Sequence, residues 1–349
     1  MTDWKALRDR HDGGGMYARV AGMAAQMRDA WSIGAAFAER LEPAPCRQVV
    51  VCGMGGSAIG GDLARAFLGD RLRAPLFVCR DYRAPAWARD GSLVIVSSYS
   101  GNTGETLSAC ASLSGGDGRF VAVSSGGKLE ELCRDGDVPL CRIPGGMPPR
   151  AAIGYSLFAT LHILRAAGAA SFGDEEYEEA LRAVEARCQE CAIDTPGNVA
   201  MEIAQAVHGR FPLVYAGPGL LEAVARRWAG QLNENAKSLA HFAIYPELNH
   251  NEIVGWQTPE ALVRGAVVLS LEDDDDHEMT RRQTEVGLGI VTQTAHSVIR
   301  LQAGTGGRLS RMLSLLVLGD FVSVYLAYLN GVDPTPVEKI DYLKRQLGR

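Results

Sequence analysis

Two loops rich in glycine and hydroxyl residues are the parts of this chain best suited to bind an anion. The first lies in GMGGSAIGG, residues 53–61, and the second in SYSGNTGETL, residues 98–107. Each follows an apolar run typical of a strand and precedes a helical pattern. Such a loop directs unpaired backbone N–H groups and the positive end of a helix dipole toward the ligand, and Ser and Thr hydroxyls add donors. The sequence therefore predicts a phosphate site formed by Gly55, Gly56, Ser57, Ser98, Ser100 and Thr103.

The glycine loop also resembles the fingerprint of a dinucleotide-binding fold, which is a competing interpretation. Gly53 and Gly55 precede a short helix, and Asp81 lies near the end of the next strand-like run. However, this acidic residue comes later than the usual interval of about 20 residues. A dinucleotide site also has no use for a second hydroxyl-rich loop after the following strand. We therefore favour phosphate binding over nicotinamide binding.

Both loops require a parallel sheet that places its strand ends at one edge. Short β-rich runs alternate with longer helical patterns along the chain, which is typical of parallel sheets covered by helices. We predict an α/β protein with two doubly wound, mostly parallel domains and a helical N-terminal extension. The expected boundaries are 1–42 for the helical segment, 43–170 for the first domain with the phosphate-binding loops, and 171–349 for the second domain with its C-terminal helix.

The second domain reads as a duplicate of the first. FPLVYAGPGLLEAVARRWAG matches QVVVCGMGGSAIGGDLARAF in layout, with Gly217 and Gly219 in the places of Gly53 and Gly55. The acidic run EDDDDHE, residues 272–278, stands where the first copy has SYSGNT. Because consecutive carboxylates repel phosphate, we expect the first copy alone to bind the anion. The acidic run itself is interpreted as a solvated turn rather than a cation site.

Composition excludes several classes of protein. A formal charge of −6 with scattered basic residues gives no footprint for nucleic acid or for an anionic membrane surface. The start of the chain lacks the apolar core of a signal peptide, and no uninterrupted apolar run approaches the roughly 18–20 residues that a membrane span needs. The eight cysteines are irregularly spaced, and Cys188 and Cys191 lie in a helical pattern without a second pair to complete a zinc site. These features predict a cytoplasmic protein.

Several motifs in combination resemble one family. GMGGSAIGG, SYSGNTGETL, VSSGG and PPRAAIGYSL look like the sugar-isomerase (SIS) domain. LNENAK, PELNHNEIVGW and DPTPVEKIDYLK are similar to the bifunctional phosphoglucose/phosphomannose isomerase family of the phosphoglucose isomerase superfamily, and the resemblance extends over roughly residues 16–349. It implies isomerisation of glucose 6-phosphate and mannose 6-phosphate to fructose 6-phosphate, on a fold of two doubly wound domains.

This reaction needs an acid/base group for ring opening, a carboxylate that moves a proton between C2 and C1, and a cation near the enediolate. The resemblance implies Glu234 in NENAK as the carboxylate, Arg150 after two prolines as the cation, and His250 in ELNHNE as the ring-opening group with Lys344 as its partner. Without the resemblance, an exposed helical glutamate, a surface arginine and a satisfied loop histidine would be ordinary interpretations of these residues. Lys339 is interpreted as part of a solvated helix face.

The resemblance also bears on partners and specificity. In the superfamily the histidine reaches the site from the partner subunit, which implies a homodimer whose active site includes His250 of the second copy. No metal or other cofactor is expected, because both sugars give the same enediol and nothing resembles the ligand cluster of metal-dependent isomerases. Single-substrate members place a glutamine seven residues before the lysine, whereas this chain has Val337, with Thr335 nearby. The smaller residue suits a dual-specificity enzyme and leaves the role of Thr335 open.

Two other functions stay in view. A non-catalytic sugar-phosphate-binding regulator would keep the phosphate loops, but it would have no reason to keep Glu234, His250, Arg150 and Lys344 together. Such a regulator would usually carry a DNA-binding module, and the segment before the first predicted strand is short and insufficiently basic. A synthase that couples paired SIS domains to an ammonia-producing domain would need an N-terminal cysteine nucleophile, and residue 2 is Thr.

Overall fold

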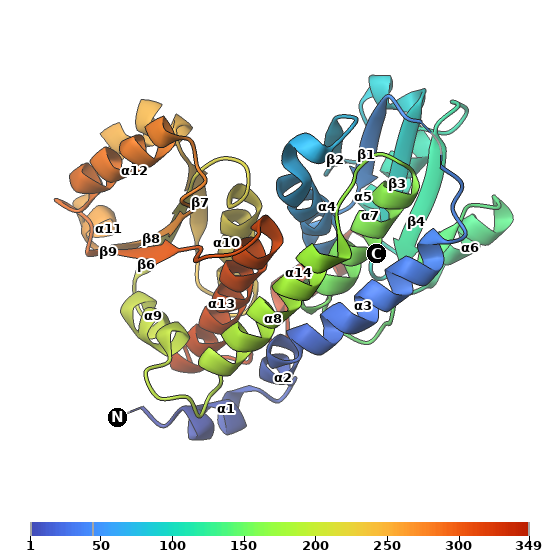
Figure 1. The fold of residues 1–349 in the computed structure, drawn as a ribbon. Helices are drawn as coiled ribbons and strands as arrows, with labels where there is room; N and C mark the ends of the chain where they lie inside the picture. Colours follow the sequence, from blue (N-terminus) through green and yellow to red (C-terminus); the bar gives the residue numbers. More distant parts are fainter. Residues whose placement is uncertain (1, 44, 348–349) are drawn as a thin grey trace. The chain divides into compact units, whose positions relative to one another are not determined.

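The chain folds as two compact units in a computed structural model that describes residues 2–43 and 45–347 (Figure 1). The first-copy unit comprises Ala24–Asp174. The second-copy unit comprises the segment up to Met23 together with the chain from Glu175 onward. The division after Asp174 lies close to the predicted boundary at residue 170. The helical segment predicted as 1–42 is itself divided between the two units.

A five-stranded parallel sheet forms the centre of the first-copy unit, in the order β2-β1-β3-β4-β5. Its strands are β1 (Gln48–Cys52), β2 (Leu76–Cys79), β3 (Ser92–Ser97), β4 (Arg119–Ser124) and β5 (Leu140–Arg142). The central strand β3 is buried at every position, and its sequence SLVIVS is apolar and rich in β-branched residues, as a strand covered on both faces requires. The register places Cys52 beside Cys79 and Val96, so these strand ends lie level at one edge.

Helices cover both faces of this sheet (Figure 1). They are α3 (Met23–Ala38), α4 (Gly55–Leu68), α5 (Gly104–Ser112), α6 (Gly127–Asp135) and α7 (Ile153–Ala166), with short 3₁₀ turns η1 (Gly69–Arg71), η2 (Ala86–Arg89) and η3 (Pro149–Ala151). Val50 and Val94 pack in one cluster with Ala109 of α5 and Leu129 of α6. On the opposite face, α4 approaches β1 closely, because a Cβ at Gly61 would lie only 3.0 Å from Val51 Cγ1.

The sheet of the second-copy unit repeats this topology with four parallel strands in the order β7-β6-β8-β9. They are β6 (Phe211–Ala216), β7 (His241–Ile244), β8 (Ala266–Glu272) and β9 (Ser297–Gln302). The α-helices of this unit are α1 (Trp4–His11), α2 (Met16–Ala21), α8 (Asp174–Glu190), α9 (Val199–Val207), α10 (Glu222–Glu234), α11 (Glu260–Arg264), α12 (Glu278–Val291), α13 (Arg308–Leu329) and α14 (Glu338–Gln346), with 3₁₀ turns η4 (Glu247–His250) and η5 (Glu252–Gly255). Because β7-β6-β8-β9 corresponds to β2-β1-β3-β4, the predicted α/β class with two parallel-sheet domains is confirmed.

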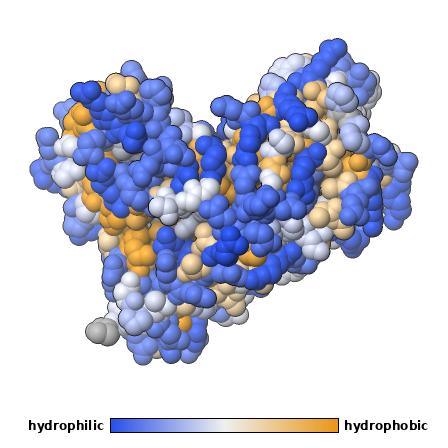
Figure 2. All heavy atoms as spheres, viewed as in Figure 1, coloured by the Kyte–Doolittle hydropathy of each residue, from blue (hydrophilic) through white to orange (hydrophobic). Residues whose placement is uncertain are grey.

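Helix α13 is the core of the second-copy unit. By length and composition it could cross a membrane, which the sequence analysis did not anticipate, but 89% of its most apolar window is buried inside the protein. The rings of Trp4 and Tyr325 meet at 5.3 Å between centroids, so the N-terminal segment packs against α13. The face shown in Figure 2 is mostly hydrophilic, with apolar residues gathered in a few patches. The burial of α13 indicates that it serves as a core helix.

Candidate active site

The hydroxyl residues predicted to bind phosphate come together in the first-copy unit. They follow β1 and β3, which are neighbours in the sheet, so both loops leave the same edge. Tyr99 N donates to Ser57 Oγ at 3.2 Å and joins the two loops. Ser98 Oγ donates to Thr103 Oγ1 at 3.0 Å across the second loop. Thr103 is also the N-cap residue of α5, yet its side chain makes no cap hydrogen bond, so that hydroxyl does not satisfy the helix N–H groups.

Glycines allow these loops to approach one another and a ligand. A Cβ at Gly101 would lie 1.7 Å from Gly126 O, so the loops after β3 and β4 touch backbone to backbone. A Cβ at Gly56 would lie 2.7 Å from Pro149 O, which brings the turn before Arg150 against the glycine loop. Gly55 has φ +49° and open space where a side chain would stand. Gly55 is therefore the position of this loop where a ligand can reach the backbone.

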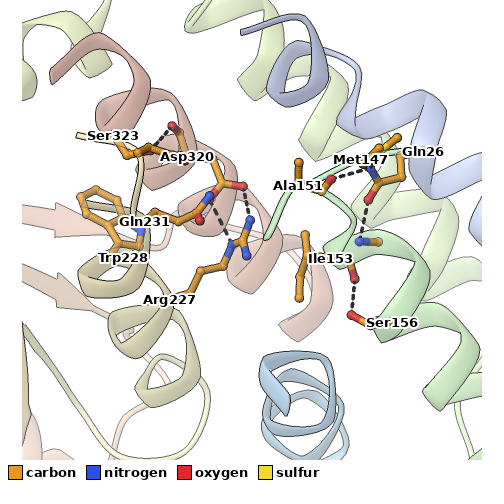
Figure 3. A network of polar contacts seen from close by, with 12 residues as sticks. Gln26, Met147, Ala151, Ile153, Ser156, Arg227, Trp228, Gln231, Asp320 and Ser323 are labelled. Atoms are coloured by element: carbon orange, nitrogen blue, oxygen red, sulfur yellow. Dashed lines mark hydrogen bonds and ion pairs between the residues drawn. The ribbon is translucent and has the colours of Figure 1, made fainter. Parts of the chain in front are cut away.

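Arg150 lies in η3 and is 5% exposed. The turn around it is fixed by Gln26, whose Nε2 donates to Ala151 O at 2.8 Å and whose Oε1 accepts from Gly154 N at 2.7 Å (Figure 3). Since Gly56 contacts Pro149, the buried guanidinium belongs to the same region of the unit as the phosphate loops. The structure thus brings together Ser57, the Ser98–Thr103 loop and the Arg150 turn.

One hydroxyl of this region was missed by sequence reasoning. Thr106 lies in the first turn of α5 and is 1% exposed, and its Oγ1 has no hydrogen-bond partner among the described residues. A buried hydroxyl without a partner is costly. The signal was present in the sequence, because Thr106 lies one helical turn after Thr103 within SYSGNTGETL. Only its burial distinguishes it from an ordinary helical threonine.

In the second-copy unit, the two asparagines beside Glu234 hold the end of α10. Asn233 Nδ2 donates to Ala229 O at 2.7 Å and to Ala240 O at 2.9 Å, which ties α10 to the start of β7. Asn235 Nδ2 donates to Ser323 Oγ of α13 at 2.9 Å. Glu234 is half-buried between these two anchors. The flanking residues of NENAK therefore fix the backbone on both sides of the carboxylate.

A buried polar network that begins at Arg227 fixes α10 against α13 (Figure 3). Arg227 binds Asp320 through two hydrogen bonds, Nε to Oδ1 at 3.0 Å and Nη2 to Oδ2 at 2.7 Å, and Gln231 Nε2 donates to Oδ1 at 2.9 Å. Arg227, Gln231 and Asn235 are spaced four residues apart and share one helix face. Because buried charges are stable only when paired, this network allows a single register between the two helices. That register determines where Glu234 lies.

Glu234 lines a cavity of about 620 Å³ within the second-copy unit. One wall comes from the end of α10 and its connection to β7, and the other comes from the segment between α13 and α14 together with the first turn of α14. The lining residues are Asn233, Glu234, Lys237, Leu239, Val332, Asp333, Pro336, Val337, Glu338, Lys339 and Ile340. Lys237, which has φ +53°, joins the walls by donating from Nζ to Glu234 O at 2.8 Å and to Pro334 O at 3.1 Å.

The structure therefore separates the predicted site residues of this unit into two groups. Glu234 and Val337 share the cavity, together with Lys339, which the sequence analysis interpreted as part of a solvated helix face. His250 in η4 and Lys344 on α14 are exposed and do not line this cavity. Helix α14 has no buried residue. The catalytic roles of Glu234, His250, Lys344 and Arg150 stay predictions.

An apolar groove of about 320 Å³ lies beside His250. It is lined by Asn249, Ile253, Met279, Arg282, Gln283, Val286, Gly287 and Ile290. Val254 and Val286 are 67% and 62% exposed, and Met279 and Ile290 are also exposed. Asn249 Nδ2 donates to Gln283 O at 3.1 Å and so fixes the histidine turn against α12. This groove is a surface suited to burial by another protein surface.

The acidic run after β8 fills the crevice that corresponds to the phosphate site of the first copy. A Cβ at Gly217 would lie 2.0 Å from Asp276 Oδ2, so that carboxyl group packs directly on the glycine loop after β6. Asp273 is 3% exposed and pairs with Arg311, with Nε to Oδ1 at 3.0 Å. The interpretation of the run as a solvated turn is therefore wrong for Asp273 and Asp276. Among the described residues, no group of three or more His, Cys, Asp or Glu is placed to hold a metal ion.

Asp276 makes the stability of the protein depend on pH. Burial, reinforced by Asp273, raises the pKa of this carboxyl from 3.8 to about 7, although Arg281 and Arg308 act in the opposite direction. The folded chain then binds a proton that the unfolded chain releases, so stability falls as pH rises from about 4 to 7. We expect Asp276→Asn to be about 1–2 kcal/mol more stable than the parent near pH 8, allowing for solvent screening, with the difference shrinking toward pH 5. Urea unfolding at both pH values checks this, and identical pH dependence of the two proteins would contradict it.

Comparisons with known proteins agree with these features. The model of the bacterial phospho-glucose isomerase C-terminal SIS domain matches residues 197–347. The bifunctional phosphoglucose/phosphomannose isomerase of Caldicellulosiruptor bescii is 36% identical over 334 residues, which cover 95% of this chain and 98% of that protein. The protein of the same name from Aquifex aeolicus is 36% identical over 304 residues, covering 87% of this chain and 91% of its own.

Solved structures show the same fold at low sequence identity. The C-terminal domain of glucosamine-fructose-6-phosphate aminotransferase from Francisella tularensis has a TM-score of 0.67 at 16% identity, covering 92% of this chain and 98% of that one. The fold agrees with this similarity. Because it is 36% identical to the two relatives over most of its length, the chain belongs to the bifunctional phosphoglucose/phosphomannose isomerase family.

Proposed function

We propose that this protein interconverts glucose 6-phosphate and mannose 6-phosphate with fructose 6-phosphate by metal-independent proton transfer through an enediolate. The observation that carries the proposal is the 620 Å³ cavity with Glu234 in its wall. Its volume lies within the roughly 300–1,000 Å³ typical of small-molecule sites. The names of the Caldicellulosiruptor bescii and Aquifex aeolicus relatives point to the same two substrates.

Each part of the reaction has a residue of suitable chemistry. The hydroxyls of Ser57, Ser98, Ser100 and Thr103, with the backbone at Gly55 and Gly56, bind the phosphate. Glu234 moves the proton between C2 and C1, and Arg150 stabilises the negative charge of the enediolate. The two sugars differ only at C2 and lose their difference when that proton leaves, so one base serves both. The cavity wall also carries the ammonium groups of Lys237 and Lys339, which the carboxylates of Glu234, Asp333 and Glu338 balance.

The active form is a homodimer in which His250 of each chain, with Lys344, serves ring opening at a shared site. Two observations support this part of the proposal. His250 is exposed and does not line the cavity that contains Glu234. The apolar groove beside it has several exposed aliphatic side chains, which a second copy would bury. The dimer acts in the cytoplasm without nucleic-acid or membrane partners, and its eight free cysteines suit a reducing compartment.

The experiment that tests the activity is a pair of coupled assays on purified protein treated with a chelator. Formation of fructose 6-phosphate is followed separately from glucose 6-phosphate and from mannose 6-phosphate. We expect turnover of both substrates at comparable rates. Activity on glucose 6-phosphate alone would retain the mechanism but contradict dual specificity, and activity that returns only with added metal would contradict the metal-independent route.

The alternative of a non-catalytic regulator makes a different prediction for the same protein. Such a protein would bind both sugar phosphates in calorimetry but form no fructose 6-phosphate. Binding without turnover would therefore favour the regulator.

A further inference from the structure

The sequence HDGGGM near the N-terminus contacts the wall of the Glu234 cavity. Gly14 lies against the side chain of Thr335, because a Cβ at Gly14 would stand 2.1 Å from Thr335 Oγ1, 2.3 Å from its Cβ and 2.7 Å from its Cγ2. No side chain fits at position 14 unless Thr335 moves. Gly13 differs, since its Cβ would meet Asp333 Oδ2 at 3.5 Å, an ordinary contact distance. The close approach is thus specific to the middle glycine.

The glycine turn is held from both sides, so it cannot simply move away from Thr335. Asp12 Oδ1 accepts from Met16 N at 2.7 Å, and Asp12 Oδ2 accepts from Tyr17 N at 2.9 Å. The same carboxylate accepts a hydrogen bond from the Tyr328 hydroxyl of α13 at 2.9 Å. Since α13 is the core helix of this unit, the turn is anchored to the most buried element of the second-copy unit.

Thr335 belongs to the segment that separates this turn from the cavity. Its own side chain contacts Gly14, whereas the next two residues, Pro336 and Val337, line the cavity with Glu234. Thr335 N donates to Asp333 Oδ1 at 2.8 Å, and Lys237 Nζ holds Pro334 O at 3.1 Å. Thr335 therefore contacts Gly14 and directly precedes two residues of the cavity wall. Because Pro336 and Val337 follow it in the chain, we expect a displacement of Thr335 away from Gly14 to displace them as well.

We propose that Gly14 is a positioning residue for substrate selectivity: by allowing Thr335 to pack against the N-terminal turn, it keeps Val337 back from Glu234 and leaves room for both C2 epimers of an aldohexose 6-phosphate. This inference rests on the proposed function. In it, Thr335 acts through packing against Gly14, and Val337 is the residue that faces the substrate. The contact joins positions at opposite ends of the chain, which explains why neither motif reveals it alone.

The test compares Gly14→Ala with the matched control Gly13→Ala. Gly14 does not have a left-handed φ, so its alanine variant is limited by Thr335 and not by its own backbone. We expect Gly14→Ala to lower the ratio of kcat/KM for mannose 6-phosphate to that for glucose 6-phosphate by roughly tenfold, the scale of a methyl-sized change in a pocket. Gly13→Ala should keep the parental ratio. Separate kcat and KM values for both sugars, with Tm for each variant, provide the measurements.

Two further variants keep the test decisive if Gly14→Ala folds poorly. In the double variant Gly14→Ala/Thr335→Gly, all three close atoms of the threonine are removed, so the ratio should return toward the parental value. Thr335→Ser alone loosens the contact without a clash, and it should shift the ratio to a smaller extent. A ratio within about twofold of the parent in soluble Gly14→Ala, or in Thr335→Ser where only that variant folds, would overturn the inference even if Tm falls.

The parent protein separates this inference from the proposed function. A parent that converts neither sugar would overturn the proposed function and the inference with it. A parent that converts both, with a ratio insensitive to Gly14→Ala and Thr335→Ser, would overturn the inference alone.

Discussion

Replacing Glu234 with glutamine is expected to lower turnover of both sugar phosphates by about 10²- to 10⁴-fold while substrate binding changes little. The amide has the shape of the carboxylate but cannot accept the proton from C2. Its surroundings should persist, because Asn233 and Asn235 bond through their own side chains and Lys237 bonds to the backbone carbonyl of residue 234. The loss should therefore appear in kcat rather than in KM.

Three measurements together distinguish a lost base from a damaged fold. Coupled assays give kcat and KM, calorimetry gives the affinity for each sugar phosphate, and NMR in D₂O follows exchange of the C2 proton, which should disappear with the base. Glu222→Gln is the matched control, since Glu222 lies in the first turn of the same helix and does not line the cavity. Parental turnover in Glu234→Gln would remove this residue from the mechanism. Equal losses in both variants would indicate damage to α10 instead.

Local sequence patterns predicted the fold well, and they also predicted that the two hydroxyl-rich loops follow neighbouring strands. A buried strand such as β3, with the sequence SLVIVS, is recognisable because its apolar residues are consecutive and bounded by turns. The hydroxyls of Ser98 and Thr103 could also be recognised locally. The two residues are only five positions apart in one loop, and their hydroxyl groups are in contact. Where residues are neighbours along the chain, their types and spacing are sufficient to predict that they lie together.

The cavity around Glu234 could not be predicted in the same way. Its two walls come from the end of α10 with the following connection and from the segment that leads into the first turn of α14, which are distant in sequence. Lys339 is exposed on α14, as its interpretation as part of a solvated helix face requires, but the sequence did not indicate that it also lines this cavity. The contact between Gly14 and Thr335 is an even longer-range example. Such juxtapositions follow from tertiary packing, which residue patterns do not encode locally.

The acidic run shows how a local rule can fail. Consecutive carboxylates usually stay in water, because burying one without a partner is costly. Here Arg311 of α13 pairs with Asp273 and with Asp275, while Asp276 is partly buried on Gly217 with a raised pKa. The crevice that we propose to hold phosphate in the first copy is thus filled by a side chain of the chain itself in the second.

Mixing two inactive variants is expected to restore activity if the dimer shares its active sites. His250→Ala lacks the ring-opening group and Glu234→Gln lacks the proton-transfer base, so each homodimer should be inactive at both sites. In a hybrid dimer with shared sites, one site receives Glu234 and the other chain's intact His250, and the second site receives both substitutions. Random exchange makes about half of the dimers hybrid, with one working site in two, so about a quarter of parental activity should return.

Purified hybrid dimers give a sharper test than a mixture of dimers. Co-expression with two different affinity tags isolates the hybrid dimers, which should then have about half of the parental kcat with an unchanged KM. In the matched controls, both differently tagged chains carry the same substitution, and these dimers should stay inactive. If His250 served the site of its own chain, every site in the hybrid would lack one group, and purified hybrids would be as inactive as the controls. Because the exposed groove beside His250 is the surface expected to join the copies, a charged substitution such as Val286→Glu should abolish both the hybrid and its activity.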